Sequence, residues 1–103
     1  MSEMQSTRMS LEQIISTKWT VPIMQILLDG PARFSDLKRR LPLVSANVLT
    51  KRLRDLEQED LLDRVCLPPP ADRQAYILTP RGGDMRSVLE AIRALSQRWG
   101  EAP

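Results

Sequence analysis

In this 103-residue chain, the stretch from Ser35 to Glu59 gives the clearest indication of the fold, and it reads SDLKRRLPLVSANVLTKRLRDLEQE. Ser35 and Ser45 are residue types that cap helix N-termini, and Pro42 lies between them, where it ends the first of two helices. We therefore expect a short helix capped by Ser35, a turn of about four residues, and a second helix from Ser45 to about Glu59. This order, with an apolar residue in the turn, is typical of a helix-turn-helix.

The second helix of this pair divides into an apolar and a polar face. The apolar residues fall on one stripe, which we expect to be buried: Val48, Leu49, Leu53 and Leu56. The opposite face carries polar and basic side chains: Asn47, Thr50, Lys51 and Arg54. A recognition helix needs this division, because one side packs on the domain while the other meets base edges. The pattern therefore predicts a helix that reads DNA.

The charges are unevenly distributed, although the formal net charge is only +2. Residues 33–54 hold seven basic side chains and one acid, whereas residues 55–63 hold five acids and no base. A basic segment suits a polyanion, since each Lys or Arg that neutralises a phosphate releases a counterion. Charges that only solvate a helix surface are the alternative, and Arg40 and Arg52 could pair with the acids that begin at Asp55. Their placement on one helix face favours DNA binding.

Two helices are expected before this pair. Ser10 opens a capping box for a short helix that reaches about Thr17. Thr20 is the cap candidate of the next helix, which a Gly-Pro pair ends. Residues 1–9 are polar and without period, so we expect a flexible lead-in followed by one domain over residues 10–100.

Two β-favouring runs follow the pair. They span residues 64–67 and 74–78, and the proline-rich loop between them cannot be a regular strand. A hairpin directly after a recognition helix is a wing, and Arg73 lies near its tip, where a cation can reach the minor groove or a phosphate. Cys66, the single cysteine, falls in the first strand, where we expect a small buried apolar side chain rather than a redox sensor.

A final helical region begins at Thr79-Pro80 and continues to the C-terminus, with an irregular first turn at Gly82-Gly83. A chain this small cannot easily bury its long apolar stripe together with the apolar face of the first helix. We therefore expect these two helices to pack across a two-fold axis in a homodimer. The alternative is that the stripe packs on its own domain. The expected interface residues are Leu11, Ile14, Ile15, Val88, Ile92, Leu95 and Trp99.

Composition excludes most other functional classes. The chain has no histidine, one cysteine and four glycines that form no phosphate loop, which argues against His-based catalysis and a structural zinc site. We therefore expect no enzyme activity, no cofactor and no metal. No apolar run is long enough to cross a bilayer and the N-terminus does not read as a signal peptide, so we expect a cytoplasmic protein without a membrane partner.

The order of the motifs resembles the HxlR family of winged-helix regulators. The resemblance covers about residues 14–99 and rests on Lys18-Trp19, residues 33–37 (RFSDL), residues 48–57 (VLTKRLRDLE) and residues 76–82 (YILTPRG). It implies a homodimeric, bacterial-type DNA-binding regulator that is related in architecture to MarR-type proteins and binds a pseudo-palindromic operator. Some members sense oxidants or electrophiles through a cysteine near the N-terminus, and this chain departs there, since no cysteine precedes Cys66.

The expected fold is thus mainly α with a small β-hairpin wing, a winged helix-turn-helix that dimerises through its N- and C-terminal helices. The expected function is sequence-specific binding of double-stranded DNA by a transcriptional regulator, most simply a repressor. We expect DNA contacts from Ser35, Lys38, Arg39, Ser45, Asn47, Thr50, Lys51, Arg54 and Arg73. Asn47 could pair with an adenine edge, and Lys51 or Arg54 with guanine or a phosphate.

Two alternatives stay open at the level of the sequence. A winged helix can dock on a protein partner instead of DNA. A regulator can also sense a small-molecule effector, here in a cavity between the dimer helices near Trp19, Met24 and Met85.

Overall fold

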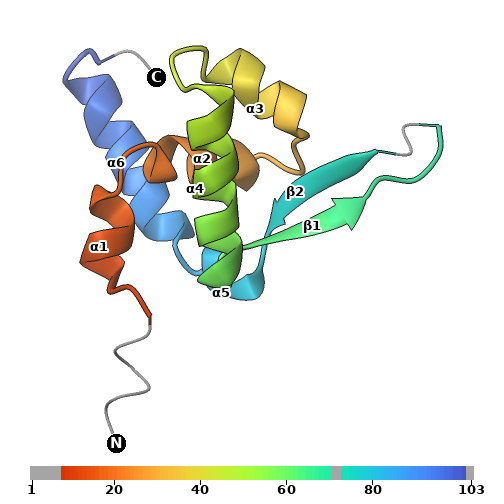
Figure 1. Ribbon diagram of the computed structural model, residues 1–103. Coiled ribbons are helices and arrows are strands. Elements are labelled where there is room, and N and C mark those ends of the chain that lie inside the picture. Colours follow the sequence, from red (N-terminus) through yellow and green to blue (C-terminus); the bar gives the residue numbers. More distant parts are fainter. Residues whose placement is uncertain (1–7, 71–72, 102–103) are drawn as a thin grey trace, which may run out of the picture.

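The computed structural model describes residues 8–70 and 73–101, which form six helices and one antiparallel hairpin (Figure 1). In chain order the elements are α1 (Leu11–Ser16), α2 (Thr20–Leu28), α3 (Phe34–Arg40), α4 (Ala46–Gln58), β1 (Leu62–Cys66), β2 (Gln74–Leu78), α5 (Pro80–Gly83) and α6 (Arg86–Arg98). The mainly helical fold with a small hairpin confirms the predicted fold class. No helix in these two ranges is long and apolar enough to cross a membrane.

Three of the predicted helix caps are confirmed. The Ser10 hydroxyl accepts from the Gln13 amide at 3.1 Å, and the Gln13 side chain accepts from the Ser10 amide at 2.7 Å. Ser45 accepts from the amide three residues on at 3.1 Å, and Thr79 does the same with Gly82 at 3.0 Å. Each oxygen satisfies an amide that the first turn of a helix leaves unpaired, so the sequence places these helix starts correctly.

Two predicted caps are wrong. α2 begins at Thr20 itself, which is buried, and the cap position belongs to Trp19 in a left-handed conformation with φ 77°. α3 begins one residue before Ser35, because the Asp36 carboxylate accepts from the Arg33 amide at 3.0 Å and makes Arg33 the cap residue. The start of α3 is therefore marked by a carboxylate inside its first turn, which accepts from the amide of the cap residue, and not by the Ser35 hydroxyl.

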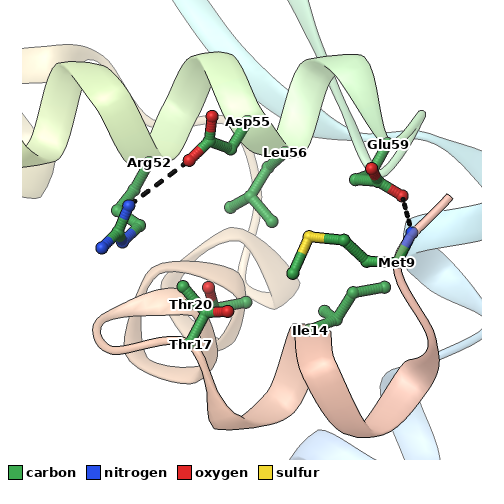
Figure 2. A pocket seen from close by; sticks show the side chains of 8 residues that line it. All are labelled: Met9, Ile14, Thr17, Thr20, Arg52, Asp55, Leu56 and Glu59. Carbon is green, nitrogen blue, oxygen red and sulfur yellow. Dashed lines mark hydrogen bonds and ion pairs between the residues drawn. The ribbon is translucent and has the colours of Figure 1, made fainter. Parts of the chain in front are cut away.

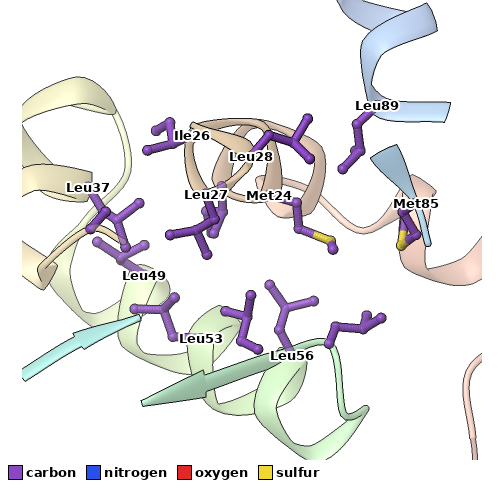
Figure 3. Close-up of a cluster of buried hydrophobic side chains, with 14 of the residues drawn as sticks. Met24, Ile26, Leu27, Leu28, Leu37, Leu49, Leu53, Leu56, Met85 and Leu89 are labelled. Atoms are coloured by element: carbon purple, nitrogen blue, oxygen red, sulfur yellow. The ribbon is translucent and has the colours of Figure 1, made fainter. Parts of the chain in front are cut away.

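The core lies around α2, which is apolar on almost every side and has six buried residues among nine. Side chains of α3, α4 and α6 converge on it (Figure 3). On α4 the expected inward residues Leu49, Leu53 and Leu56 are buried, and each contributes about 2–5 kcal/mol relative to alanine. Val48 is the exception, since 37% of it is exposed. Its direction lies about 100° from that of Leu49, on the flank of the helix rather than in the stripe.

The hairpin extends away from the helices as a wing (Figure 1). β1 pairs with β2 antiparallel from Leu62↔Leu78 to Cys66↔Gln74, so β1 begins two residues before the run that the sequence predicts. The base of the wing rests on the core and Ala75 on β2 is still buried, whereas the last pair of the hairpin, Cys66 and Gln74, is exposed. The prediction that Cys66 is buried is therefore wrong, because Cys66 lies at the exposed end of β1.

The final helical region is broken, as its glycine pair predicts: α5 ends at Gly83 and α6 begins at Arg86. Gly82 packs so closely on the Leu61 carbonyl that a β-carbon would overlap it. Of the predicted lead-in, residues 1–7 lie outside the described residues. Arg8 and Met9 contact the end of α4, where the Met9 amide donates to the Glu59 carboxylate at 3.1 Å.

Candidate nucleic-acid interface

The outward face of α4 gathers the three side chains on which the predicted site depends. At 100° per residue, Asn47, Lys51 and Arg54 fall within an arc of about 60°, and all three are exposed. The buried leucines occupy the opposite side of the same helix. Thr50 is half-buried on one flank, and Ser45 is exposed at the cap position. The division of α4 into a buried and a donor-bearing face is thus as the sequence predicts.

The basic side chains of α4 differ in what holds them. Arg52 is structural, since it donates to the Lys18 carbonyl at 3.0 Å and pairs with Asp55 at 3.3 Å. Lys51 reaches the same carboxylate at 3.5 Å, but its side chain is 69% exposed. The Arg54 side chain makes no ion pair or hydrogen bond with any other residue in the described ranges. An exposed ion pair such as that of Lys51 with Asp55 is worth less than about 1 kcal/mol, so Lys51 can exchange it for an anionic ligand. Arg54 is available to such a ligand because no ion pair with a described residue holds its side chain.

The prediction about Arg40 and Arg52 is half right. Arg52 pairs with Asp55, the first of the acids after the basic segment. Arg40 instead lies 3.9 Å from Asp29 at the end of α2. The two arginines project from different helices, and α2, rather than the end of α4, presents the carboxylate near Arg40.

A short extended segment positions α3 against the wing. Ala32 and Tyr76 exchange backbone hydrogen bonds of 3.1 and 2.8 Å, so the chain two residues before the start of α3 adds a bridge to β2. An open groove of about 230 Å³ results. It is lined by Arg33, Phe34, Ser35, Arg73, Gln74 and Tyr76. Ser35 and Arg73, which the sequence places in separate motifs, therefore line the same surface.

Sequence reasoning missed three polar residues of this groove, Arg33, Gln74 and Tyr76. Burial raises the pKa of the Tyr76 phenol above its ordinary value of 10.0, and Glu57 adds to the increase. The phenol therefore stays protonated near neutral pH and can donate a hydrogen bond to an anion. The alternation of the second β run could have marked Tyr76, but nothing local to the sequence shows that Ala32 pairs with it.

The remaining predicted residues lie on α3. Arg39 is 69% exposed and 3.3 Å from Asp36, and Lys38 is half-buried. The Arg33 amide, which donates to Asp36, holds the pKa of that carboxyl below its usual value of 3.8. The side chains of Arg33 and Arg39 also lower the pKa of Asp36. Asp36 is therefore ionised near neutral pH and serves as the cap of α3.

Replacing Asp36 with Ala should lower the free energy of unfolding by about 1 kcal/mol at neutral pH, because the Arg33 amide loses its acceptor. Since the folded pKa of this carboxyl lies below 3.8, its stabilisation is complete above that value and is lost as the pH falls through the folded value. Urea unfolding from neutral to acid pH measures the difference. Glu12→Ala, which removes an acid from the first turn of α1, should cost less. A difference between wild type and Asp36→Ala that stays constant with pH would contradict this role.

A small cavity lies where α1 meets α4 (Figure 2). Its lining residues are Met9, Ile14, Thr17, Thr20, Arg52, Asp55, Leu56 and Glu59. Its volume of about 30 Å³ has room for about one water molecule. The effector cavity predicted near Trp19, Met24 and Met85 lies between two copies and stays a prediction; in the single chain Met24 and Met85 are buried in the core.

The residues predicted for dimerisation divide into exposed and buried ones. Leu11, Leu95 and Trp99 are 47%, 40% and 68% exposed, which is unusual for large apolar side chains. Ile15, Val88 and Ile92 are half-buried. Ile14 corrects the prediction, since it is 3% exposed and belongs to the chain's own core. In the short α1, Ile14 turns toward α4 while Leu11 turns outward.

Comparison with protein families matches residues 14–103 to the family described as HxlR-like helix-turn-helix. The HTH-type transcriptional regulator YodB of Bacillus subtilis (strain 168) is 30% identical over 88 residues, which are 85% of this chain and 79% of YodB. YvaP, an HTH-type transcriptional regulator of the same strain, is 35% identical over 86 residues, or 84% of this chain and 80% of YvaP.

Solved structures agree with these relatives. The reduced form of YodB has a TM-score of 0.73 at 28% identity, covering 95% of this chain and 92% of YodB. The HTH-type regulator YtcD has a TM-score of 0.75 at 29% identity, covering 87% and 96%. The helix-turn-helix, the wing and the match over most of the chain lead to one assignment. The chain belongs to the HxlR-like helix-turn-helix family and is a DNA-binding transcriptional regulator, not an enzyme.

Proposed function

We propose that the chain acts as a homodimer in the cytoplasm, reads a pseudo-palindromic site in double-stranded DNA and represses transcription by occupying it. The observation that supports this most is the outward face of α4, where exposed Asn47, Lys51 and Arg54 project together opposite the buried leucines. A helix of this kind fits the major groove, where each base pair presents a distinct pattern of donors and acceptors.

The three side chains of that face have different roles in the proposal. Asn47, at the N-terminal end of α4, can pair with adenine through its amide, which both donates and accepts. Arg54 has no competing partner among the described residues and can bind guanine in a bidentate manner. Lys51 must exchange its long contact with Asp55 for a base or phosphate oxygen, at little cost because the pair is exposed.

The groove between α3 and the wing suits the sugar–phosphate backbone beside α4. It offers two guanidinium groups, from Arg33 and Arg73, and two hydroxyls, from Ser35 and Tyr76. Contacts of this kind hold the protein in register without reading sequence. Lys38 and Arg39 extend the basic surface along α3. Arg73 also lies next to the wing tip, from which a cation can enter the minor groove.

The outer face of α6 suits the second copy. Val88, Ile92, Leu95 and Trp99 fall within an arc of about 60° on that helix. None of them is fully buried in the single chain, since Val88 and Ile92 are half-buried and Leu95 and Trp99 are exposed. Leu11 on α1 is exposed as well, and both helices lie away from the wing (Figure 1). Packing two such faces across a two-fold axis would leave both α4 helices outside, about 34 Å apart along the duplex.

A small-molecule effector is the less supported part of the prediction. A solved structure of the relative YodB is quinone-bound, with a TM-score of 0.71 and 26% identity to this chain. The cavity where α1 meets α4 has room for only about one water, so it is too small for such an effector. The effector pocket between two copies stays a prediction.

Selection from a pool of random duplexes tests the proposal. The purified protein should enrich a site with two inverted halves whose centres lie about one helical turn apart. Affinity for the enriched duplex should fall steeply with salt, because phosphate contacts release counterions. If the protein instead enriched no sequence and bound duplex DNA with no salt dependence, a protein-docking role would replace this function.

A further inference from the structure

Two large apolar side chains are exposed at the N-terminal end of the recognition helix. Leu43, in the turn between α3 and α4, is 87% exposed, and Val48, in the first turn of α4, is 37% exposed. The neighbouring Val44 is only 1% exposed, so the turn already supplies the core with one anchor. The core therefore does not account for Leu43 and Val48, which we call the apolar tip.

The apolar tip is continuous with the donor-bearing face of α4. Val48 follows Asn47 directly, and its direction lies about 60° from that of Lys51. Its backbone amide donates to the Ser45 hydroxyl at 3.1 Å, which fixes this first turn. In a helix-turn-helix the N-terminal residues of the recognition helix are those that contact base edges. Val48 thus borders the surface that would face the bases.

The chemistry of the groove limits what an apolar side chain can bind there. Most groups on the major-groove edges of bases are hydrogen-bond donors or acceptors, whereas the C5 methyl group of thymine is apolar. We propose that Val48 contacts a thymine methyl group in each half-site, with Leu43 covering the adjoining edge of the duplex. This inference rests on the proposed function, because it assigns a base-reading role within the same interface.

Charge favours DNA over a protein as the occupant of the apolar tip. The turn follows directly on Arg39 and Arg40, which are exposed, and Lys51 lies one helical turn beyond Val48. A polyanion with methyl groups between its phosphates matches such a surface, since cations and apolar side chains alternate on it. A purely apolar partner would make no contact that uses these cations, whose own partners are surface carboxylates in weak pairs.

Replacing thymine by uracil in the selected duplex removes only the methyl group, so it tests this contact directly. For the wild-type protein, one symmetric pair of T→U replacements should weaken binding by about fourfold per half-site, the value of one buried methyl group. Val48→Ala should bind the thymine duplex correspondingly more weakly and should not distinguish uracil from thymine at that position. Equilibrium binding of fluorescent duplexes measures both.

Lys51→Ala is the matched control, since it should weaken binding to both duplexes while the thymine preference remains. The inference is overturned if the wild type binds the selected duplex tightly and no T→U replacement changes its affinity. It is also overturned if Val48→Ala keeps the full thymine preference. A wild type that prefers no sequence at all would instead remove the proposed function itself, so the two failures are distinguishable.

Discussion

Replacing Lys51 and Arg54 together with Ala should weaken binding to the selected duplex by at least about 100-fold, because each direct contact is worth about 1–3 kcal/mol. The fold should be retained. Both side chains are exposed, and the only ion pair lost is the surface contact between Lys51 and Asp55. Such a pair contributes about 0.3–0.5 kcal/mol. Equilibrium binding and thermal unfolding of the same preparation separate the two effects.

Arg86→Ala is the matched control for this variant. Arg86 is an exposed helical arginine that pairs with Glu90 at i,i+4, as Lys51 pairs with Asp55, but it belongs to α6. Its removal should change the affinity less than about twofold, which is the size of a non-local charge effect. Equal losses in the two variants would show that general charge, rather than the α4 face, determines binding. An unchanged affinity of the double variant would remove the role assigned to Lys51 and Arg54.

Replacing Leu95 with Asp should convert the proposed dimer into a monomer. Leu95 is 40% exposed in the single chain, so a carboxylate at this position is hydrated in the monomer. In the proposed dimer the same carboxylate would be buried at the interface with no cation to pair with, which costs free energy. We expect the dimer to weaken by at least about 100-fold, a loss of several kcal/mol. Operator affinity should fall with it, since two linked half-sites bind far more tightly than one. Sedimentation equilibrium measures the first effect.

Gln97→Asp provides the control for a charge on α6. Gln97 is exposed and points about 160° away from Leu95 around the helix, so its replacement should leave both the dimer and operator binding intact. A wild-type protein that stays monomeric at micromolar concentrations would contradict the dimer. So would a Leu95→Asp protein that sediments like the wild type.

Local signals in the sequence predicted the helix starts where one hydroxyl decides the outcome. The hydroxyls of Ser45 and Thr79 accept from the amide of the third residue of their helices, as cap residues do. Ser35 is predicted as a cap for the same reason, but α3 begins one residue earlier, where the Asp36 carboxylate accepts from the Arg33 amide. Two neighbouring residues can each define a helix start, and residue type alone does not show which of them does.

Burial in marginal positions was harder to predict than the helices themselves. Val48 and Ile14 both continue apolar periodicities, yet Val48 lies on a flank of α4 while Ile14 packs into the core. A side chain on the flank of a helix is buried or exposed depending on which neighbouring element packs against it. The apolar periodicity of the helix does not show which element that is. Cys66 follows the same rule at the scale of a strand, since Ala75 on β2 is buried while Cys66, one pair closer to the tip, is exposed.

The groove between α3 and the wing depends on a long-range contact that no local sequence pattern predicts. Ala32 and Tyr76 are 44 positions apart, and their backbone pairing brings Arg33 beside Arg73. The sequence predicts Ser35 and Arg73 as separate backbone contacts, but it does not mark Arg33, Gln74 or Tyr76. By contrast, the outward face of α4 lies within one helix, where the period of 3.6 residues suffices to predict it.

The side-chain amide of Asn47 offers the most direct measurement of the central claim, that the outward face of α4 meets the bases. Asn47 is the only asparagine in the chain, so its amide gives one identifiable pair of signals in a ¹H–¹⁵N spectrum. On addition of the selected duplex, this pair should shift strongly, while the side-chain amide of Gln97 on α6 should not. If the Gln97 signals shift at saturation while the Asn47 pair stays in place, the outward face of α4 does not meet the bases.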